Sequence, residues 1–288
     1  MRIVFCGTPE FALPTLQRLI AEPDFSVETV ITQPDRPRGR GQQISSSPVK
    51  DAALDAGIHV FQPEKIRSDS AFEFFKRVAP DAVVIIAYGQ IVPARLLDIP
   101  RLGWINLHGS LLRKYRGAAP IHWAIVNGEK RTGLTTMRID AGMDSGPTLL
   151  RWETGILPDE TAPALARRMA AAGPELMIET LRKYDGGAIA PLTQDHTQAT
   201  LAPMLKREDG RINWSHSAQQ IYNRIRGLDP WPGAFTSFRG HVCHIWGRPE
   251  ILSETAPPGT VILNEGAVLA ACGGGTWLRL EFVQLEGK

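Results

Sequence analysis

The sequence has few cysteines. Only three occur in 288 residues, and Cys6, Cys243 and Cys272 are too far apart to form a Cys-x-x-Cys motif. An odd number of widely spaced cysteines supports neither a disulfide framework nor a cysteine zinc site. We therefore expect a protein of a reducing compartment, and a cytoplasmic location fits this usage.

Long apolar runs are lacking as well. The longest, Ala82–Ala87, is far shorter than the ~20 residues that a membrane-spanning helix needs. The N-terminus reaches Gly7 and Pro9 too soon for a signal peptide. We expect no membrane association. The formal net charge is only +2, so an acidic partner would have to meet a local cluster of basic residues.

Common cofactor and metal motifs do not occur. The stretch FCGTPEF, which follows the first apolar run, lacks the Gly-x-Gly-x-x-Gly pattern of dinucleotide-binding proteins, and no phosphate-binding Walker motif is found. No His-Glu-x-x-His or similar cluster indicates a metal. The sequence therefore gives no support for a nicotinamide cofactor, ATP or a bound metal.

What the sequence does contain is an alternation of apolar runs and helical patterns. We expect strands at 2–7, 26–33, 81–89, 103–108, 133–140 and 146–154, and helices at 8–20, 51–58, 121–128 and 160–184. This order predicts an α/β fold, with a Rossmann-like, mostly parallel sheet and helices on both faces. Ligands of such sheets bind beyond the carboxyl ends of the strands. Residues 7–9, 88–89 and 106–110 should lie at that edge.

The composition changes near residue 188. Glycine, alanine, proline, threonine and glutamine then replace the helical periodicity, which is typical of a linker. Beyond it, one helix near 217–226 precedes short apolar runs with glycine turns, the pattern of a small antiparallel β domain. We therefore divide the chain into an α/β domain (1–188), a linker (189–205) and a C-terminal β domain (206–288).

Asn106 and His108 are the first candidate site residues. They lie two positions apart in the expected strand INLH, so both side chains should point to one face. An amide that donates hydrogen bonds and an imidazole that shuttles protons together suit an oxygen that gains negative charge when a carbonyl is attacked. The alternative is a polar strand end that water or backbone satisfies.

Asp144 is a third candidate. It occurs in DAGMDSG, where glycines and short polar residues mark a tight loop between two expected strands. A carboxylate there could orient a histidine or receive a proton. The alternative is an Asx turn, in which the side chain only caps its own loop.

Basic residues gather in PDRPRGRGQQISSSPVK, residues 34–50. Arg36, Arg38, Arg40 and Lys50 face a single acid there, Asp35. Since proline and glycine oppose regular structure, we expect a mobile basic loop, which would attract phosphates or remain a solvated surface loop. Arg101, Arg113, Lys114 and Arg116 form a second basic group, which we expect near His108.

The C-terminal part also combines basic residues with aromatics. Lys206 and Arg207 begin a stretch in which arginines outnumber acids and Trp214 and Tyr222 are interleaved. Such a mixture can bind nucleic acid. It is equally compatible with aromatics in a small core and solvated arginines.

Taken together, these motifs resemble the folate-dependent formyltransferase family. The segments FCGTPEFALPTL, INLHGSLLRKYRGAAPIHWAI and MDSG carry the general resemblance, in order along the chain. QPDRPRGRG and REDGRINW…IRGLDPWPGAF narrow it to the members that act on methionyl-tRNA. The family usually has proline where Arg113 stands, so the edge of the folate segment should differ in shape here. Its members also usually continue past VQLEGK, which leaves two alternatives: a truncated C-terminal domain or a short member of the family.

The resemblance implies a fold and a site. It implies a Rossmann-like catalytic domain and a C-terminal β-barrel of the OB type. It implies Asn106, His108 and Asp144 as catalytic residues and residues 34–50 as the segment that clamps the tRNA acceptor stem. The folate-holding segment would comprise Ser110, Leu111, Leu112 and Arg113, and the tRNA contacts would comprise Arg36, Arg38, Arg40, Lys206 and Arg207.

The resemblance also implies an activity. A monomer would transfer a formyl group from 10-formyltetrahydrofolate to the α-amino group of methionyl-initiator tRNA for translation initiation, without a metal and without a covalent enzyme intermediate. Two alternatives stay open. One is a transferase or hydrolase that uses the same folate with a small acceptor such as glycinamide ribonucleotide. The other is a non-catalytic RNA-binding protein that keeps the fold.

Overall fold

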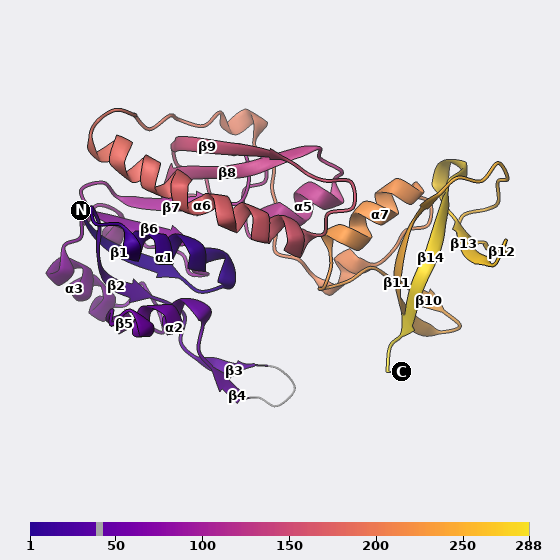
Figure 1. Ribbon diagram of the computed structural model, residues 1–288, viewed down its shortest axis with the longest axis horizontal. Coiled ribbons are helices and arrows are strands. Elements are labelled where there is room, and N and C mark those ends of the chain that lie inside the picture. The colour runs from indigo at the N-terminus through magenta and orange to yellow at the C-terminus, as the bar shows by residue number, and fades with distance from the viewer. Residues whose placement is uncertain (39–42, 288) are drawn as a thin grey trace. The chain divides into compact units, whose positions relative to one another are not determined.

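The computed structural model describes residues 1–38 and 43–287 (Figure 1). The chain divides into two compact units. The first comprises Met1–Arg116, Gly133–Glu153 and Ala166–Leu201, and the second comprises Gly117–Thr132, Thr154–Leu165 and Ala202–Lys288. The chain therefore passes between the units several times, and neither unit is one continuous segment.

A seven-stranded sheet forms the centre of the first unit. Its strands in spatial order are β5 (Val60–Phe61), β2 (Ser26–Ile31), β1 (Arg2–Gly7), β6 (Ala82–Ile86), β7 (Trp104–His108), β8 (Arg131–Arg138) and β9 (Thr148–Gly155). The first five are parallel, and β8 runs antiparallel to β7. The chain order reverses between β1 and β6, which is the point where ligands of doubly wound sheets bind.

Helices cover both faces of this sheet, as the continuous apolar strands predict. All five residues of β6 are buried, which suits a strand enclosed on both sides. Its neighbour β7 presents Trp104 to α3 (Asp69–Val78) and α4 (Ala94–Leu97): the indole contacts Phe75, and its N–H donates to the carbonyl of Leu96 at 2.8 Å. The predicted fold class of the first part is confirmed.

The other face of the sheet packs against α1 (Leu13–Ala21) and α6 (Ala162–Asp185). Gly173 of α6 lies so close that an added Cβ would stand 2.7 Å from Leu107 and 3.2 Å from the Thr15 hydroxyl. Because side chains alternate along a strand, Leu107 points to this face. Trp104, Asn106 and His108 therefore point together to the opposite face.

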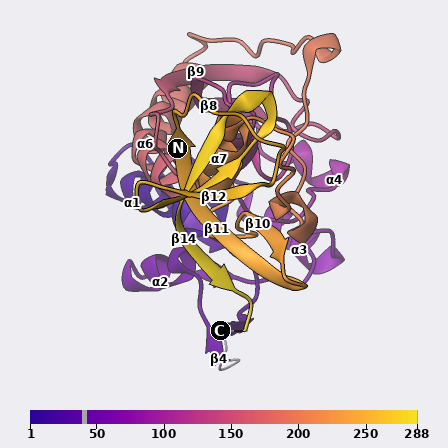
Figure 2. The same ribbon diagram turned by 90° about the vertical axis from the view of Figure 1, so that its right-hand side faces the viewer.

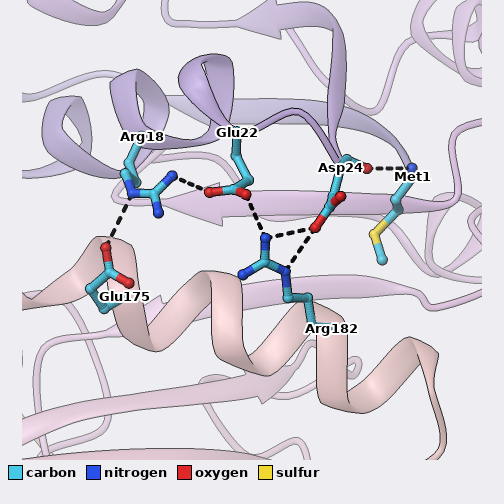
Figure 3. Close-up of polar contacts among 6 residues, drawn as sticks. All are labelled: Met1, Arg18, Glu22, Asp24, Glu175 and Arg182. Atoms are coloured by element: carbon cyan, nitrogen blue, oxygen red, sulfur yellow. Dashed lines mark hydrogen bonds and ion pairs between the residues drawn. The ribbon is translucent and has the colours of Figure 1, made fainter.

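Charged groups tie the amino edge of the sheet together. Arg182 of α6 bonds the Asp24 carboxylate at 2.6 Å and also pairs with Glu22, and Arg18 pairs with Glu22 and with Glu175 at 3.1 Å (Figure 3). These pairs connect the end of α1 and the start of β2 to α6. Exposed pairs contribute little individually, so their effect is that of a network.

The second unit contains a five-stranded antiparallel sheet (Figure 2). Its order is β10 (Phe235–Phe238), β11 (His241–Glu250), β14 (Trp277–Leu285), β13 (Ala267–Ala271) and β12 (Val261–Asn264). Helix α7 (Ala218–Gly227) begins at a capping box of Ser217 and Gln220 and packs Ile221 and Ile225 against the sheet residues. It also contacts α5 (Pro120–Val126) through Gly227. A small antiparallel C-terminal sheet is confirmed.

Residues 34–50 correct one prediction. The segment is not without regular structure, because β3 (Arg36–Arg38) pairs with β4 (Gln43–Ser45) and α2 (Pro48–Asp55) follows. Proline is compatible with a two-stranded hairpin, since both strands are edges and one N–H can face solvent. Arg40 lies outside the described residues, and of Arg38 only the backbone is described.

Some elements differ in extent from the sequence-based expectation. Helix α2 begins earlier than expected, because the Ser47 hydroxyl caps it by accepting from the N–H of Lys50 at 3.1 Å and Pro48 opens it. Helices α3 and α4 were not predicted. Residues 189–201 belong to the first unit, with bridges from Leu192 to Thr148 and from Leu201 to Arg116. The proposed domain boundaries stay a prediction.

Candidate active site

Strand β7 ends at His108, on the carboxyl edge of the sheet. The side chain of His108 is 6% exposed, and that of Asn106 is half-buried on the same face. The strand pairs with β6 on one side and with β8 on the other, so its backbone is held by ladders on both sides. Both candidate side chains therefore project from a rigid part of the fold.

The two ring nitrogens of His108 have different neighbours. Nε2 lies 2.9 Å from the carbonyl oxygen of Tyr115, and Nδ1 lies 3.6 Å from Oδ2 of Asp144. Since a carbonyl oxygen only accepts, Nε2 carries a proton. Nδ1 then faces the Asp144 carboxylate. The structure thus brings His108 and Asp144 together.

Asp144 lies in the turn between β8 and β9. Its φ is +48°, a left-handed conformation that few non-glycine residues adopt. The hydrogen bonds of an Asx turn are made here by Asp140, whose Oδ1 accepts from the N–H of Gly142 at 3.0 Å and the hydroxyl of Ser145 at 2.8 Å. Asp140 thus makes an Asx turn in this loop, while the carboxylate of Asp144 approaches His108.

The Asn106 side chain keeps unused hydrogen-bonding capacity. Its amide makes no hydrogen bond to any other residue in the described ranges 1–38 and 43–287, although the side chain is half-buried. Polar groups withdrawn from solvent normally have partners. The amide is therefore available to donate to a ligand at this edge.

The segment that follows β7 is fixed by a threonine that the sequence did not reveal. The hydroxyl of Thr135, a fully buried residue of β8, donates to the carbonyl of Ser110 at 2.7 Å and accepts from the N–H of Leu112 at 3.1 Å. Thr135 is the β-sheet partner of His108. One side chain thus sets the path of the predicted folate segment relative to the histidine.

The members of the predicted folate segment differ in access. Ser110 and Leu112 are buried, and the Ser110 hydroxyl donates to the carbonyl of Lys114 at 2.6 Å, so these two shape the turn. Leu111 is half-buried and packs so near Gly133 that an added Cβ there would stand 2.7 Å from it. Arg113 is half-buried and bonds Gln198. Leu111 and Arg113 are therefore the accessible side chains.

The predicted tRNA residues are exposed where they are described. Arg36 has 67% of its side chain exposed and approaches Glu64 only to 4.0 Å. In the second unit, Lys206 is exposed, and Arg207 pairs with Glu286 at 2.7 Å. Arg36 is therefore only weakly engaged, and Arg207 would have to exchange its acid for a phosphate.

Polar contacts anchor the base of the β3–β4 hairpin. Asp35 pairs with Lys50 and accepts from the amide of Gln62 at 3.0 Å. The adjacent Gln33 donates to the carbonyl of Tyr88, just past β6, at 2.9 Å. The basic hairpin therefore projects from the carboxyl edge, the same edge of the sheet at which β7 ends.

Arg101 corrects another expectation. It does not lie near His108, because Arg101 precedes β7 whereas His108 ends it. Its guanidinium bonds Asp81 at 3.0 Å and Asp185 at 2.6 Å at the amino edge. The whole strand, rising about 3.3 Å per residue, separates the two side chains.

Neither a metal nor a thiol nucleophile emerges from the described residues. No group of His, Cys, Asp and Glu among them could hold a metal ion. The three cysteines are free and buried, and burial raises the pKa of Cys6 well above its usual range and that of Cys272 to about 11. Buried thiols with raised pKa values are poor nucleophiles.

No helix in the described ranges 1–38 and 43–287 is long and apolar enough to cross a bilayer.

Comparisons with known proteins identify the family to which the chain is similar. Residues 1–181 match the family described as "Formyl transferase", and residues 204–288 match "Formyl transferase, C-terminal domain". A protein of Solibacter usitatus named "Methionyl-tRNA formyltransferase" is 52% identical over 289 residues, which cover 100% of this chain and 92% of the relative. A Koribacter versatilis protein of the same name is 50% identical with the same coverage.

One solved structure shows the fold at greater distance. The sugar 3N-formyl transferase WlaRD, solved in the presence of dTDP and 5-N-formyl-THF, superimposes with a TM-score of 0.70 at 18% identity, covering 100% of this chain and 98% of that one. At such identity the likeness speaks for the fold alone. The fold of this chain therefore occurs in a solved structure.

Proposed function

Because this chain belongs to the formyl transferase family, we propose that it formylates the α-amino group of methionyl-initiator tRNA with 10-formyltetrahydrofolate as donor. The product would be N-formylmethionyl-tRNA for translation initiation, a cytoplasmic role. The observation that supports the proposal is the approach of His108 to Asp144, with Asn106 on the same face of β7 as His108, in a chain that is 52% identical to the Solibacter usitatus relative over its whole length. All three residues come from one chain, which is compatible with a monomer.

The residues present fit a folate donor. When bound, the donor supplies a formyl group on a nitrogen that can leave. The half-buried amide of Asn106 has no partner in the described chain, so it can bind the formyl oxygen without losing another contact. The segment Ser110–Arg113 is held in place by Thr135 and leaves Leu111 and Arg113 accessible for the rest of the molecule.

The three polar residues divide the chemistry of acyl transfer. A free α-amine has a pKa near 7.7, so a large fraction is neutral and nucleophilic at physiological pH. Asn106 would donate to the formyl oxygen as its negative charge grows, with His108 beside it on the same face. Asp144 would keep the ring oriented, and the His108–Asp144 pair would carry the proton from the attacking amine toward the leaving nitrogen.

Attack on the formyl group by the substrate amine requires no enzyme nucleophile. The three cysteines are buried, and the hydroxyl of Ser110 is already bonded to the carbonyl of Lys114. Direct transfer is therefore the step that the described side chains support.

We further propose that the basic residues hold the tRNA. Arg36, Arg38 and Arg40 would contact phosphates near the acceptor end, and Lys206 and Arg207 would contact the tRNA backbone elsewhere. The exposure of Arg36 and its weak contact with Glu64 support this role, because little must be broken to free the guanidinium.

A parallel acceptor assay tests the function. The purified protein is given 10-formyltetrahydrofolate with methionyl-initiator tRNA, methionyl-elongator tRNA or glycinamide ribonucleotide, and the formylated product is measured. We expect product from the initiator tRNA in large preference to the other two. Product only from glycinamide ribonucleotide, or folate hydrolysis with no acceptor, would replace the proposal by the corresponding alternative. The absence of any folate reaction would favour an RNA-binding protein.

A further inference from the structure

Gln194 binds the backbone of the turn that carries Asp144. Its side chain is 6% exposed, and Nε2 donates to the carbonyl oxygen of Asp144 at 3.0 Å and to that of Gly146 at 2.7 Å. One amide group thus holds the turn on both sides of Ser145. Asp144 has a positive φ, and a residue in that conformation needs support from its surroundings.

The opposite end of the same amide is held by Arg116. Oε1 of Gln194 accepts from Nε of Arg116 at 3.2 Å and from Nη2 at 2.7 Å. Because a guanidinium only donates and a carbonyl only accepts, this amide fits in one orientation. Both of its N–H groups and both lone pairs on oxygen are used, so the contact is directional as well as buried.

The arginine is also connected to the histidine. Arg116 follows Tyr115, whose carbonyl oxygen lies 2.9 Å from Nε2 of His108. The turn at 115–116 therefore holds His108 directly and holds the Asp144 turn through Gln194. These contacts form a closed circuit through Tyr115, Arg116, Gln194, Asp144 and His108, and the last link is the 3.6 Å approach of Nδ1 to the carboxylate.

The buried guanidinium of Arg116 lowers the stability of the fold more than a neutral side chain at this position would. Its side chain is 7% exposed, and within the described ranges the guanidinium hydrogen-bonds only Gln194 and, at 3.2 Å, Nδ1 of His196, with no carboxylate among its partners. Burying a charge without an opposite charge is unfavourable. A neutral side chain could fill the same space at lower cost, but it could not donate two hydrogen bonds to Gln194.

We propose that Gln194, held by Arg116, is a positioning residue that sets the distance and direction of the Asp144 carboxylate relative to His108. The inference rests on the proposed function, since it assigns Gln194 a part in the same reaction. A displacement of about 1 Å at a catalytic group can cost on the order of 100-fold in rate. Gln194 itself touches neither reacting group, so its effect would pass through Asp144.

Two substitutions of different character test the proposal. Gln194→Glu keeps an acceptor for Arg116 but turns a negative oxygen toward two carbonyl oxygens, and Gln194→Met removes all four hydrogen bonds without adding charge. For both we expect the single-turnover formylation rate to fall about 10- to 100-fold, while KM for tRNA and folate changes less than about threefold. Gln17→Glu, on the exposed side of α1, is the charge-matched control and should leave the rate unchanged.

The same changes in an Asp144→Asn background separate positioning from general structural damage. If Gln194 acts through Asp144, Gln194→Met should cost less than about twofold once that carboxylate is gone. An equal loss in both backgrounds, or a wild-type rate for Gln194→Met alone, would overturn the positioning role. A wild-type rate for Asp144→Asn alone would instead remove Asp144 from the proposed reaction, and with it the route by which Gln194 acts.

Discussion

The two edges of the seven-stranded sheet treat polar groups in opposite ways. At the amino edge, Arg101 bonds both Asp81 and Asp185, and Arg182 bonds both Glu22 and Asp24 (Figure 3). At the carboxyl edge, the amide of Asn106 has no partner within the described chain. The charged groups of the amino edge bond one another and stabilise the fold. The carboxyl edge retains an amide that can still bond a ligand.

The difference separates residues that hold the sheet from residues that act on a substrate. The amino-edge pairs join elements distant in sequence, such as Arg101, just before β7, and Asp185, the last residue of α6. The His108–Asp144 pair also joins distant segments, but at 3.6 Å it is looser than a hydrogen bond and so can change when a substrate enters. We therefore expect amino-edge substitutions to affect stability and carboxyl-edge substitutions to affect formylation.

The largest effect should come from the site itself. Asn106→Ala, His108→Ala and Asp144→Ala should each reduce single-turnover formylation of methionyl-initiator tRNA about 100- to 1000-fold, because each removes an oxyanion donor or a proton carrier. Circular dichroism and thermal unfolding check that the variants fold. Near-wild-type turnover for Asn106→Ala or His108→Ala would contradict the inference that carboxyl-edge residues act on the substrate whereas amino-edge residues stabilise the sheet.

Substitutions of the hairpin arginines should lower the affinity for tRNA and leave the rate of formyl transfer at saturating tRNA unchanged. Arg36→Ala combined with Arg38→Ala should weaken tRNA binding about tenfold at low salt and reduce the slope of log affinity against log salt by about 2, since two phosphate contacts are lost. Saturating tRNA should restore the rate. Arg77→Ala, an exposed arginine at the end of α3 toward the amino edge, is the matched control. If the rate at saturation fell while affinity held, the clamp would be disproved.

A smaller effect is expected for the support of the folate segment. Thr135→Val leaves the Ser110 carbonyl and the Leu112 N–H without their shared partner, which should raise KM for the folate donor about three- to tenfold. Thr136→Val is the control: Thr136 is equally buried on the same strand, but its hydroxyl bonds Thr180 at 2.8 Å on the other face. Equal KM values for the two variants would argue against a role of Thr135 at the donor.

The smallest effect on formylation is expected for a substitution at the amino edge, where Asp81 stabilises the fold. The N–H of Arg2, with a further contribution from Arg101, lowers the pKa of the Asp81 carboxyl. Because the folded pKa is below the unfolded value near 3.9, this stabilisation is present above that value and is lost as pH falls through the folded pKa. Asp81→Asn should cost about 1 kcal/mol at pH 7 and progressively less below about pH 4.

Urea unfolding at several pH values measures the effect of Asp81→Asn, and formylation at pH 7 should not change. A cost that is constant with pH would show that the charge of Asp81 does not stabilise the folded state. A lower rate of formylation would show that the amino edge also takes part in catalysis.

Much of the fold could be predicted, because burial leaves a periodic trace in sequence. The continuous apolar run at 82–86 predicted a buried strand, and the helix at 162–185 was expected within a few residues. The hairpin β3–β4 was missed since proline and glycine counts report local propensity and not the pairing partner. Arg101 was misplaced because closeness in sequence says little about the two ends of a strand.

The site was predictable in part for a related reason. Asn106 and His108 are two apart on one strand, so their common face follows from the period of a strand alone. The approach of Asp144 depended on the resemblance, because nothing local connects it to a histidine 36 positions earlier. Thr135 and Gln194 carried no motif at all: their importance arises from backbone carbonyls that only the folded chain brings within reach.

Residues 194–201 bond segments far earlier in the chain, and this matters when parts are exchanged between relatives. The first family match ends at residue 181, yet Gln194 bonds the Asp144 turn and Thr200 accepts from the N–H groups of Tyr115 and Arg116. In a chimera joined at residue 181, the residues at positions 194 and 200 that bond the Asp144 turn and the 115–116 turn would therefore come from the protein that supplies the C-terminal part. A graft meant to swap tRNA preference while sparing turnover should place its junction after Leu201.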